Sequence, residues 1–228
     1  MDVETFSPGL RVIGVTGGVG AGKSTVANAL VSALPGTLID ADAIVSELYQ
    51  DPQVLSDIEL KLETTIRDES GRLDRPALGQ LIFANPGARD LVESVLHPGV
   101  RKKMWQAMDS LEKSGEPAWA VLDVPLLREG GLDVLCDFVV HVSVPAAERC
   151  ARACARHGWT PEIWEAREKA QIAEAEKARL ADGMVDNRAG RDSLQAQIRD
   201  LVLILHCLPP HSLQERWPTW EQAPLAQQ

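Results

Sequence analysis

The feature that most constrains this chain is a glycine-rich segment, Gly-Gly-Val-Gly-Ala-Gly-Lys-Ser, at residues 17–24. It satisfies the pattern G-x-x-x-x-G-K-[ST]. The apolar, β-branched run over residues 11–16 predicts a buried strand before it, and the spacing of Val26, Leu30 and Leu34 predicts an amphipathic helix after it. This is the context in which the pattern binds nucleotide phosphates. The sequence therefore predicts a phosphate-binding loop (P-loop) in an α/β fold.

The residue types in the loop have chemical reasons. Backbone N–H groups can surround a polyphosphate only where no Cβ blocks the approach, and four of the six residues 17–22 are glycine. Lys23 is expected to reach the β and γ phosphates, Ser24 to ligate Mg²⁺ and Thr25 to contact the α phosphate. The residues predicted to bind the nucleotide here are Gly17, Gly18, Val19, Gly20, Ala21, Gly22, Lys23, Ser24 and Thr25.

The remaining pattern divides the chain into a core and an insertion. Apolar runs near residues 37–40, 118–125, 138–145 and 184–187 predict further strands of a parallel sheet flanked by helices. We expect this core over 11–50 and 118–207, a helical lobe over 51–117, a small helical lid near 150–180, an N-terminal extension over 1–10 and a flexible tail over 208–228.

Proline and capping residues locate several helix ends. Asp74 before Pro76, and Asn85 before Pro86, predict helix starts inside the lobe. His97-Pro98 predicts a helix break. One long polar helix is expected from Pro161 to about residue 180.

Composition excludes several classes of protein. Hydrophobic residues make up 45% of the 228, enough for a core, and 23 basic against 33 acidic residues give a net charge of −10, which disfavours nucleic acid and anionic membrane surfaces as partners. The longest apolar runs fall far below the roughly 20 residues of a membrane-spanning helix, and the N-terminus lacks a secretory pattern. We expect a cytoplasmic monomer or small homo-oligomer whose partners are small molecules, with its four cysteines reduced.

The loop alone does not identify the second substrate, because many classes of nucleotide-binding protein share it. The sequence has neither the N-K-x-D motif that reads guanine nor a D-x-x-G motif after a strand, which argues against a GTPase. A motor or transport ATPase would be expected to have adjacent acidic residues at the end of a strand. The nearest candidate segment here has only one, Asp123. Phosphoryl transfer to a small acceptor is therefore the leading class.

Such a transfer needs a carboxylate near the acceptor and cations for the transferred charge. Asp40 and Asp42 follow a predicted strand at the sheet edge that the loop borders, so Asp42 is a candidate base, while one of the pair is expected to cap the next helix. Arg149, Arg152 and Arg156 recur at helical spacing and predict a cationic face.

Taken together, the motifs resemble the dephospho-CoA kinase family over residues 11 to about 205. The resemblance is carried by TGGVGAGKST (16–25), IDAD (39–42), GRLDRPALGQLIFANP (71–86), LHPGV (96–100), VPLLREGG (124–131), FVVHVSVP (138–145), Arg152, Arg156, Gln171 and ADGMVDN (181–187).

The resemblance implies a P-loop kinase, a transferase with a parallel sheet, a helical CoA-binding lobe and a lid. It would use ATP and Mg²⁺ to phosphorylate the ribose 3′-hydroxyl of dephospho-CoA, the last step of coenzyme A biosynthesis. Two alternatives stay open. One is another P-loop small-molecule kinase acting on a nucleoside or sugar, and the other is a non-catalytic, nucleotide-gated binding module.

The resemblance also implies roles for single residues. Asp42 would be the base and would contact the acceptor, Lys23 and Arg152 would stabilise the transferred charge, and Ser24 would serve the metal. Arg156 and Asn187 would bind the nucleotide. The residues implied to bind the acceptor are Leu73, Phe83, His97 and Pro125.

Three further residues have open roles. Arg149 has no sure counterpart in the family pattern. Asp123 either reaches the magnesium shell through water or simply ends its strand, and Glu129 either caps a helix or makes a polar contact.

Overall fold

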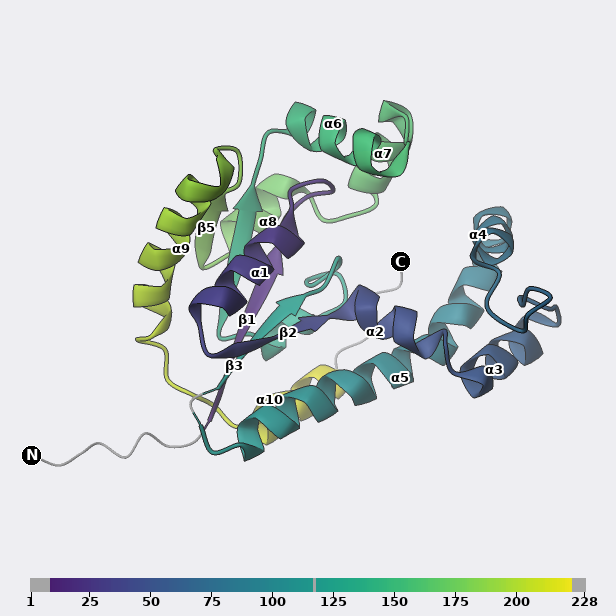
Figure 1. The fold of residues 1–228 in the computed structure, drawn as a ribbon, viewed down its shortest axis with the longest axis horizontal. Helices are drawn as coiled ribbons and strands as arrows, with labels where there is room; N and C mark the ends of the chain where they lie inside the picture. Colours follow the sequence, from purple (N-terminus) through teal and green to yellow (C-terminus); the bar gives the residue numbers. More distant parts are fainter. Residues whose placement is uncertain (1–8, 117, 223–228) are drawn as a thin grey trace, which may run out of the picture. The chain divides into compact units, whose positions relative to one another are not determined.

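A single five-stranded sheet forms the core of the structure, a computed structural model that describes residues 9–116 and 118–222. The strand order is β2-β3-β1-β4-β5 (Figure 1). The strands are β1 (Leu10–Thr16), β2 (Gly36–Asp40), β3 (Ala118–Asp123), β4 (Phe138–Ser143) and β5 (Gly183–Asp186). The parallel sheet flanked by helices confirms the predicted fold class.

The register of β1 determines which residues meet at the carboxyl edge of the sheet. Val15 of β1 lies opposite Asp123 of β3, and Thr16 lies opposite His141 of β4, in parallel pairings. Because β1 is fully buried and runs directly into the glycine loop, the loop begins beside the last residue of β3 and within two residues of the end of β4.

Two helices close one face of this sheet. Helices α1 (Lys23–Ala33) and α9 (Gly190–Leu205) pack against each other, and their buried side chains join one apolar cluster with β1, β3, β4 and β5. The other helices are α2 (Ala41–Leu48), α3 (Pro52–Leu62), α4 (Arg75–Ala84), α5 (Pro86–Lys113), the 3₁₀ helix η1 (Leu132–Leu135), α6 (Ala146–His157), α7 (Pro161–Lys169), α8 (Glu174–Leu180) and α10 (Leu213–Gln222).

The chain forms two compact units, one of residues 40–107 and the other of the remaining described residues. The helical unit starts earlier than the predicted lobe, 51–117, because Leu48 of α2 is buried with Leu55, Ile58 and Leu96 in that unit's own core. It also ends earlier, inside α5. The predicted acceptor role of this unit stays a prediction.

Two predicted helix boundaries are wrong. Helix α5 continues through Pro98, although a proline there deprives one carbonyl of its helical hydrogen bond. Leu96 before Pro98 and Met104 after it are buried, so tertiary packing stabilises the helix across the proline. The single helix expected over residues 161–180 is two, α7 and α8, because the backbone N–H of Ile172 donates to Glu129 Oε1 instead of continuing a helix.

The capping predictions are confirmed for the described residues. Asp74 accepts a hydrogen bond from the backbone N–H of Ala77 at the start of α4, and α5 begins at Pro86 after Asn85. Asp40 accepts one from Ala43 at the start of α2, so it is the capping member of the Asp40/Asp42 pair.

Part of the segment expected to be a flexible tail forms a helix, α10 (Leu213–Gln222). Leu213 and Trp217 of α10 are buried, and Arg216 donates to the carbonyls of Leu10 and Leu135 and to Asp137 Oδ2. These partners are non-local, so the local Pro- and Gln-rich composition did not indicate them. Residues 1–8 and 223–228, parts of the predicted extension and tail, lie outside the described residues.

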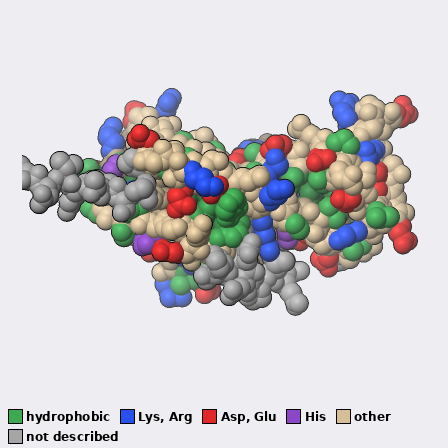
Figure 2. Space-filling view, turned by 90° about the horizontal axis from the view of Figure 1, so that it is seen from below, with side chains coloured by type: hydrophobic (Ala, Val, Ile, Leu, Met, Phe, Trp, Pro, Cys, Tyr) green, Lys and Arg blue, Asp and Glu red, His purple; other side chains and the backbone are tan. Residues whose placement is uncertain are grey.

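The described surface carries mixed charge. Figure 2 shows acidic and basic side chains interspersed on the face that it draws. Within the described part of the chain, no helix is both long enough and apolar enough to cross a membrane.

We predict that Arg216→Ala lowers the free energy of unfolding by about 3 kcal/mol, because it leaves the carboxylate of Asp137 buried without this cation. Denaturant unfolding measures the effect. The matched control is Arg179→Ala, which removes an exposed arginine 3.9 Å from Glu176 and should cost less than about 1 kcal/mol. Equal effects of the two substitutions would contradict the structural role of α10.

Candidate active site

The glycine loop between β1 and α1 has a backbone that other residues cannot readily adopt. Gly20 and Gly22 have φ values of 88° and 84°, in the left-handed region. A Cβ on Gly20 would lie 2.2 Å from the backbone oxygen of Arg149, and one on Gly22 would lie 2.4 Å from Asn187 Nδ2. The two glycines therefore allow α6 and the end of β5 to approach the loop.

Lys23 folds over the loop that precedes it. Its Nζ donates to the carbonyl oxygens of Gly17 at 3.1 Å and Gly18 at 3.4 Å. Burial lowers the pKa of this ammonium and the positive charge of Lys177 lowers it further, while the nearby carboxylate of Asp123 acts in the opposite direction. The ammonium of Lys23 thus lies at the start of α1 over the loop, where the sequence predicts the β and γ phosphates.

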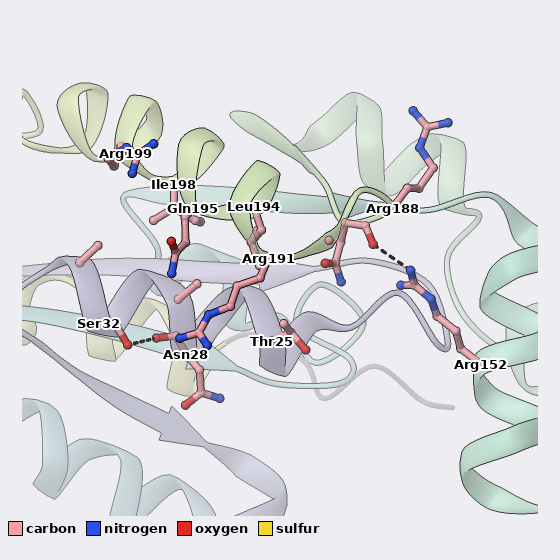
Figure 3. Close-up of a pocket in the computed structure, with 14 residues that line it drawn as sticks. Thr25, Asn28, Ser32, Arg152, Arg188, Arg191, Leu194, Gln195, Ile198 and Arg199 are labelled. Carbon is pink, nitrogen blue, oxygen red and sulfur yellow. Dashed lines mark hydrogen bonds between the residues drawn. The ribbon is translucent and has the colours of Figure 1, made fainter.

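The hydroxyl side chains Ser24 and Thr25 are exposed in the first turn of α1. The unpaired N–H groups of a helix start and its dipole favour an anion at this end. Thr25 also lines a pocket of about 830 Å³ between α1 and α9. Figure 3 shows Arg191 extending from α9 toward Asn28 of α1 within it.

Asn187, predicted to bind the nucleotide, and Arg152, predicted to stabilise the transferred charge, both line this pocket and contact each other. Asn187 Nδ2 donates to the carbonyl of Ala21 in the loop at 2.9 Å, and Arg152 donates to the backbone oxygen of Asn187 at 2.9 Å (Figure 3). Arg152 also pairs with Glu148 at 2.5 Å. Arg156 lies exposed in the last turn of α6.

The three arginines of α6 do not share one environment. Arg149 is only 3% exposed and points at the loop, where it pairs with Glu168 of α7. Its Nε donates to the carbonyl of Val144 at 3.1 Å. Helical spacing alone suggests one cationic face, but the approach of α6 to Gly20 turns Arg149 inward.

Sequence reasoning missed Lys177, a buried lysine close to the loop. It is 1% exposed, and its Nζ lies 2.7 Å from Gln171 Oε1 and 3.1 Å from Glu129 Oε1. Glu129 also accepts from Ile172, so its role is to hold the link between α7 and α8. The surrounding polar sequence is typical of an exposed helix, and only Gln171 stands among the family motifs.

Sequence reasoning also missed a pair between His141 of β4 and Glu174 of α8. His141 is 2% exposed, and its Nε2 is 2.9 Å from Glu174 Oε1. Burial of Glu174 opposes its ionisation, but the hydrogen bond from His141 and the charge of Arg149 outweigh it and lower the pKa of Glu174. Glu174 also lies near enough to Lys23 to act on it electrostatically.

The acceptor residues expected from the sequence belong mainly to the helical unit. Asp42 is exposed in the first turn of α2, Leu73 is half-buried beside a core cluster, and His97 is half-buried within α5. The side chain of Phe83 lies outside the described residues. Pro125 follows β3 in the other unit and is exposed.

The helical unit has a pocket of its own, about 620 Å³ in volume. Ser46 and Tyr49 of α2 line it, together with Leu73 and Arg75. The guanidinium of Arg75 lies 5.9 Å from the centre of the Tyr49 ring. Asp42 precedes Ser46 by one helical turn, so both lie along the same side of α2.

Comparisons with known proteins identify the family. The family model described as Dephospho-CoA kinase matches residues 11–193. The dephospho-CoA kinase of Symbiobacterium thermophilum is 43% identical over 190 residues, 83% of this chain and 79% of the relative, and that of Deinococcus radiodurans is 36% identical over 188 residues, 82% and 89%.

Solved structures agree with the matches in sequence. A crystal structure of a Thermus thermophilus protein has a TM-score of 0.71 at 32% identity, covering 86% of this chain and 97% of the other. The dephospho-CoA kinase of Campylobacter jejuni has a TM-score of 0.57 at 23% identity, covering 86% and 97%. The expected function, ATP-dependent phosphorylation of dephospho-CoA, is confirmed, and nothing favours either alternative. The chain belongs to the dephospho-CoA kinase family.

Proposed function

We propose that the loop over residues 17–25 binds the triphosphate of ATP and that Asp42 activates the 3′-hydroxyl of dephospho-CoA. The observation that carries this proposal is the loop itself, whose glycine backbone is closed by Lys23 and opens toward the pocket lined by Thr25 and Asn187. A polyphosphate fits the loop because amide donors, a helix start and an ammonium converge there.

The nucleotide would engage only residues of the unit that contains the sheet, the described residues outside 40–107, which we call the sheet unit. Lys23 exchanges its bonds to the carbonyls of Gly17 and Gly18 for bonds to the β and γ phosphates. Asn187 would border the adenosine part, and Arg156 would contribute a further positive charge from the end of α6. A pocket of about 830 Å³ is within the range of ligand-binding pockets.

Mg²⁺ would be held by the hydroxyl of Ser24 together with phosphate oxygens, with Asp123 reaching its shell through water. The donor set fits this ion, which prefers oxygen ligands and usually keeps several waters beside substrate phosphates. Asp123 is 6% exposed at the end of β3, and its charge acts on Lys23. The ion would supply neutralisation of the charge on the transferred group.

The acceptor would occupy the helical unit. Arg75 and Tyr49 offer a cation and an aromatic ring in that unit's pocket, suited to an adenosine diphosphate moiety. Leu73, Phe83 and His97 belong to the same unit, and Pro125 is assigned to the acceptor from the other unit.

The reaction is an in-line transfer. Asp42 takes the proton of the 3′-hydroxyl while its oxygen bonds to the γ phosphorus, and the bond from that phosphorus to the β,γ-bridging oxygen breaks. Lys23 and Arg152 stabilise the charge on the transferred group. The products are coenzyme A and ADP. Exclusion of water by the lid prevents hydrolysis of ATP. A cytoplasmic location remains a prediction.

The direct test incubates the purified chain with ATP, Mg²⁺ and dephospho-CoA and follows the acceptor by mass spectrometry. The expected result is the gain of one phosphate on the acceptor, with one ADP formed for each. ADP formed without phosphorylated acceptor would contradict the proposed transfer.

For the base, we predict that Asp42→Asn lowers kcat by about 10²-fold or more while the Kd for ATP stays nearly unchanged, because the amide cannot accept the proton. Asp40→Asn is the matched control, since asparagine caps a helix about as well as aspartate and activity should be kept. Steady-state kinetics and calorimetry measure both constants. A loss of ATP binding in Asp42→Asn would instead make this residue structural.

For the lid cation, we predict that Arg152→Ala lowers kcat by about 10²-fold, the cost typical of removing one group that stabilises transition-state charge. Arg179→Ala, on the exposed side of α8, serves as the control for a lost positive charge. Wild-type turnover in Arg152→Ala would refute the assignment.

A further inference from the structure

A carboxylate of the protein itself occupies part of the phosphate-binding loop. Glu168, on α7, accepts a hydrogen bond from the backbone N–H of Val19 through Oε2, with a distance of 3.0 Å. Its Oε1 pairs with the guanidinium of Arg149, on α6. One anionic side chain thus joins a loop amide to a buried cation.

The surroundings hold this arrangement in place. Arg149 donates to the carbonyl of Val144 at 3.1 Å, and its guanidinium lies 5.4 Å from the centre of the Trp164 ring. Trp164 Nε1 donates to the carbonyl of Val19 at 3.0 Å. Both backbone groups of Val19 are therefore engaged by α7, and Arg149 has only one carboxylate partner, Glu168, among the described residues.

The two donors that hold Glu168 are those that bind phosphate in other sites, a backbone amide in a glycine loop and an arginine. A carboxylate and a phosphate oxygen compete for such donors because both are anionic acceptors. Glu168 also lies near enough to Lys23 to act on it electrostatically. A triphosphate entering the loop would meet a negative charge already in place.

The burial of Arg149 determines what must happen if a nucleotide displaces Glu168. A guanidinium that is 3% exposed cannot be left without an anionic partner except at high cost in free energy. If Glu168 leaves when the nucleotide arrives, a phosphate must take over its role toward Arg149. The terminal phosphate is the one nearest, because Val19 lies in the half of the loop away from α1.

We propose that Glu168 is a placeholder anion that the terminal phosphate of ATP displaces, and that Arg149 is a further phosphate-binding residue of this kinase. The inference rests on the proposed nucleotide site. It makes the lid helix α7 responsive to the nucleotide, because α7 loses its carboxylate contact with Val19 when the phosphate replaces it.

The decisive variant is Glu168→Gln, which keeps an oxygen for Val19 and Arg149 but removes the charge. The matched control is Glu165→Gln, one turn earlier on α7, where the carboxylate is exposed and pairs with Lys169 at 2.8 Å. Calorimetry should show ATP bound about tenfold more tightly by Glu168→Gln, the size expected for one nearby charge at a protein surface, and unchanged by Glu165→Gln.

ADP distinguishes the terminal phosphate from a general charge effect. Since ADP lacks that phosphate, its affinity should rise much less in Glu168→Gln than that of ATP. The gain for ATP should also disappear in the double variant Arg149→Gln/Glu168→Gln, because the cation that receives the phosphate is then absent. If Glu168→Gln fails to fold, Glu168→Asp, whose shorter side chain draws the carboxylate back from Val19, should show a smaller gain of the same kind.

The experiments distinguish failure of the proposed nucleotide site from failure of the placeholder role of Glu168. A wild-type chain that bound no ATP would overturn the proposed nucleotide site and this inference with it. A chain that binds ATP through Lys23, shown by loss of binding in Lys23→Ala, but binds it equally or more weakly in Glu168→Gln, would overturn the placeholder role alone.

Discussion

The parallel pairing of β1 with both β3 and β4 is the constraint on which the rest of the sheet unit depends. It brings the carboxyl ends of three strands to one edge, so the glycine loop lies beside Asp123 and His141, although both lie about a hundred residues or more further along the chain. Because β1 is buried on both faces, it cannot shift in register without exposing its apolar side chains. The loop therefore starts from a rigid platform.

Close packing of the helices around the loop gathers charged side chains beside it. Helix α6 approaches Gly20 so closely that its backbone would collide with any side chain there, and this approach buries Arg149. Lys23 and Lys177 add positive charge, and Glu129 and Glu168 balance it. On a chain with a net charge of −10, cations are thus concentrated where an anionic ligand is expected.

Much of the fold was predictable because it is encoded in local patterns. The strand, loop and helix around Gly17–Ser24 and the cap at Asp74 follow from residue types at short spacing, and the structure has them as expected. Pro98 and the segment around Trp217 were not predicted correctly. In both places burial against distant residues outweighs the local preference, so α5 continues and α10 forms.

For this protein the sequence by itself determined the phosphate loop, the parallel sheet and the kinase family, because each depends on motifs whose chemistry is local. The tertiary structure alone decided that Arg149 faces the loop rather than solvent, that Lys177 is buried near enough to Lys23 to act on it electrostatically, and that Glu168 contacts the amide of Val19. These relations join residues from separate helices. Their charge and spacing along the chain are typical of exposed helical faces, and only the packing of α6, α7 and α8 around the loop brings them together.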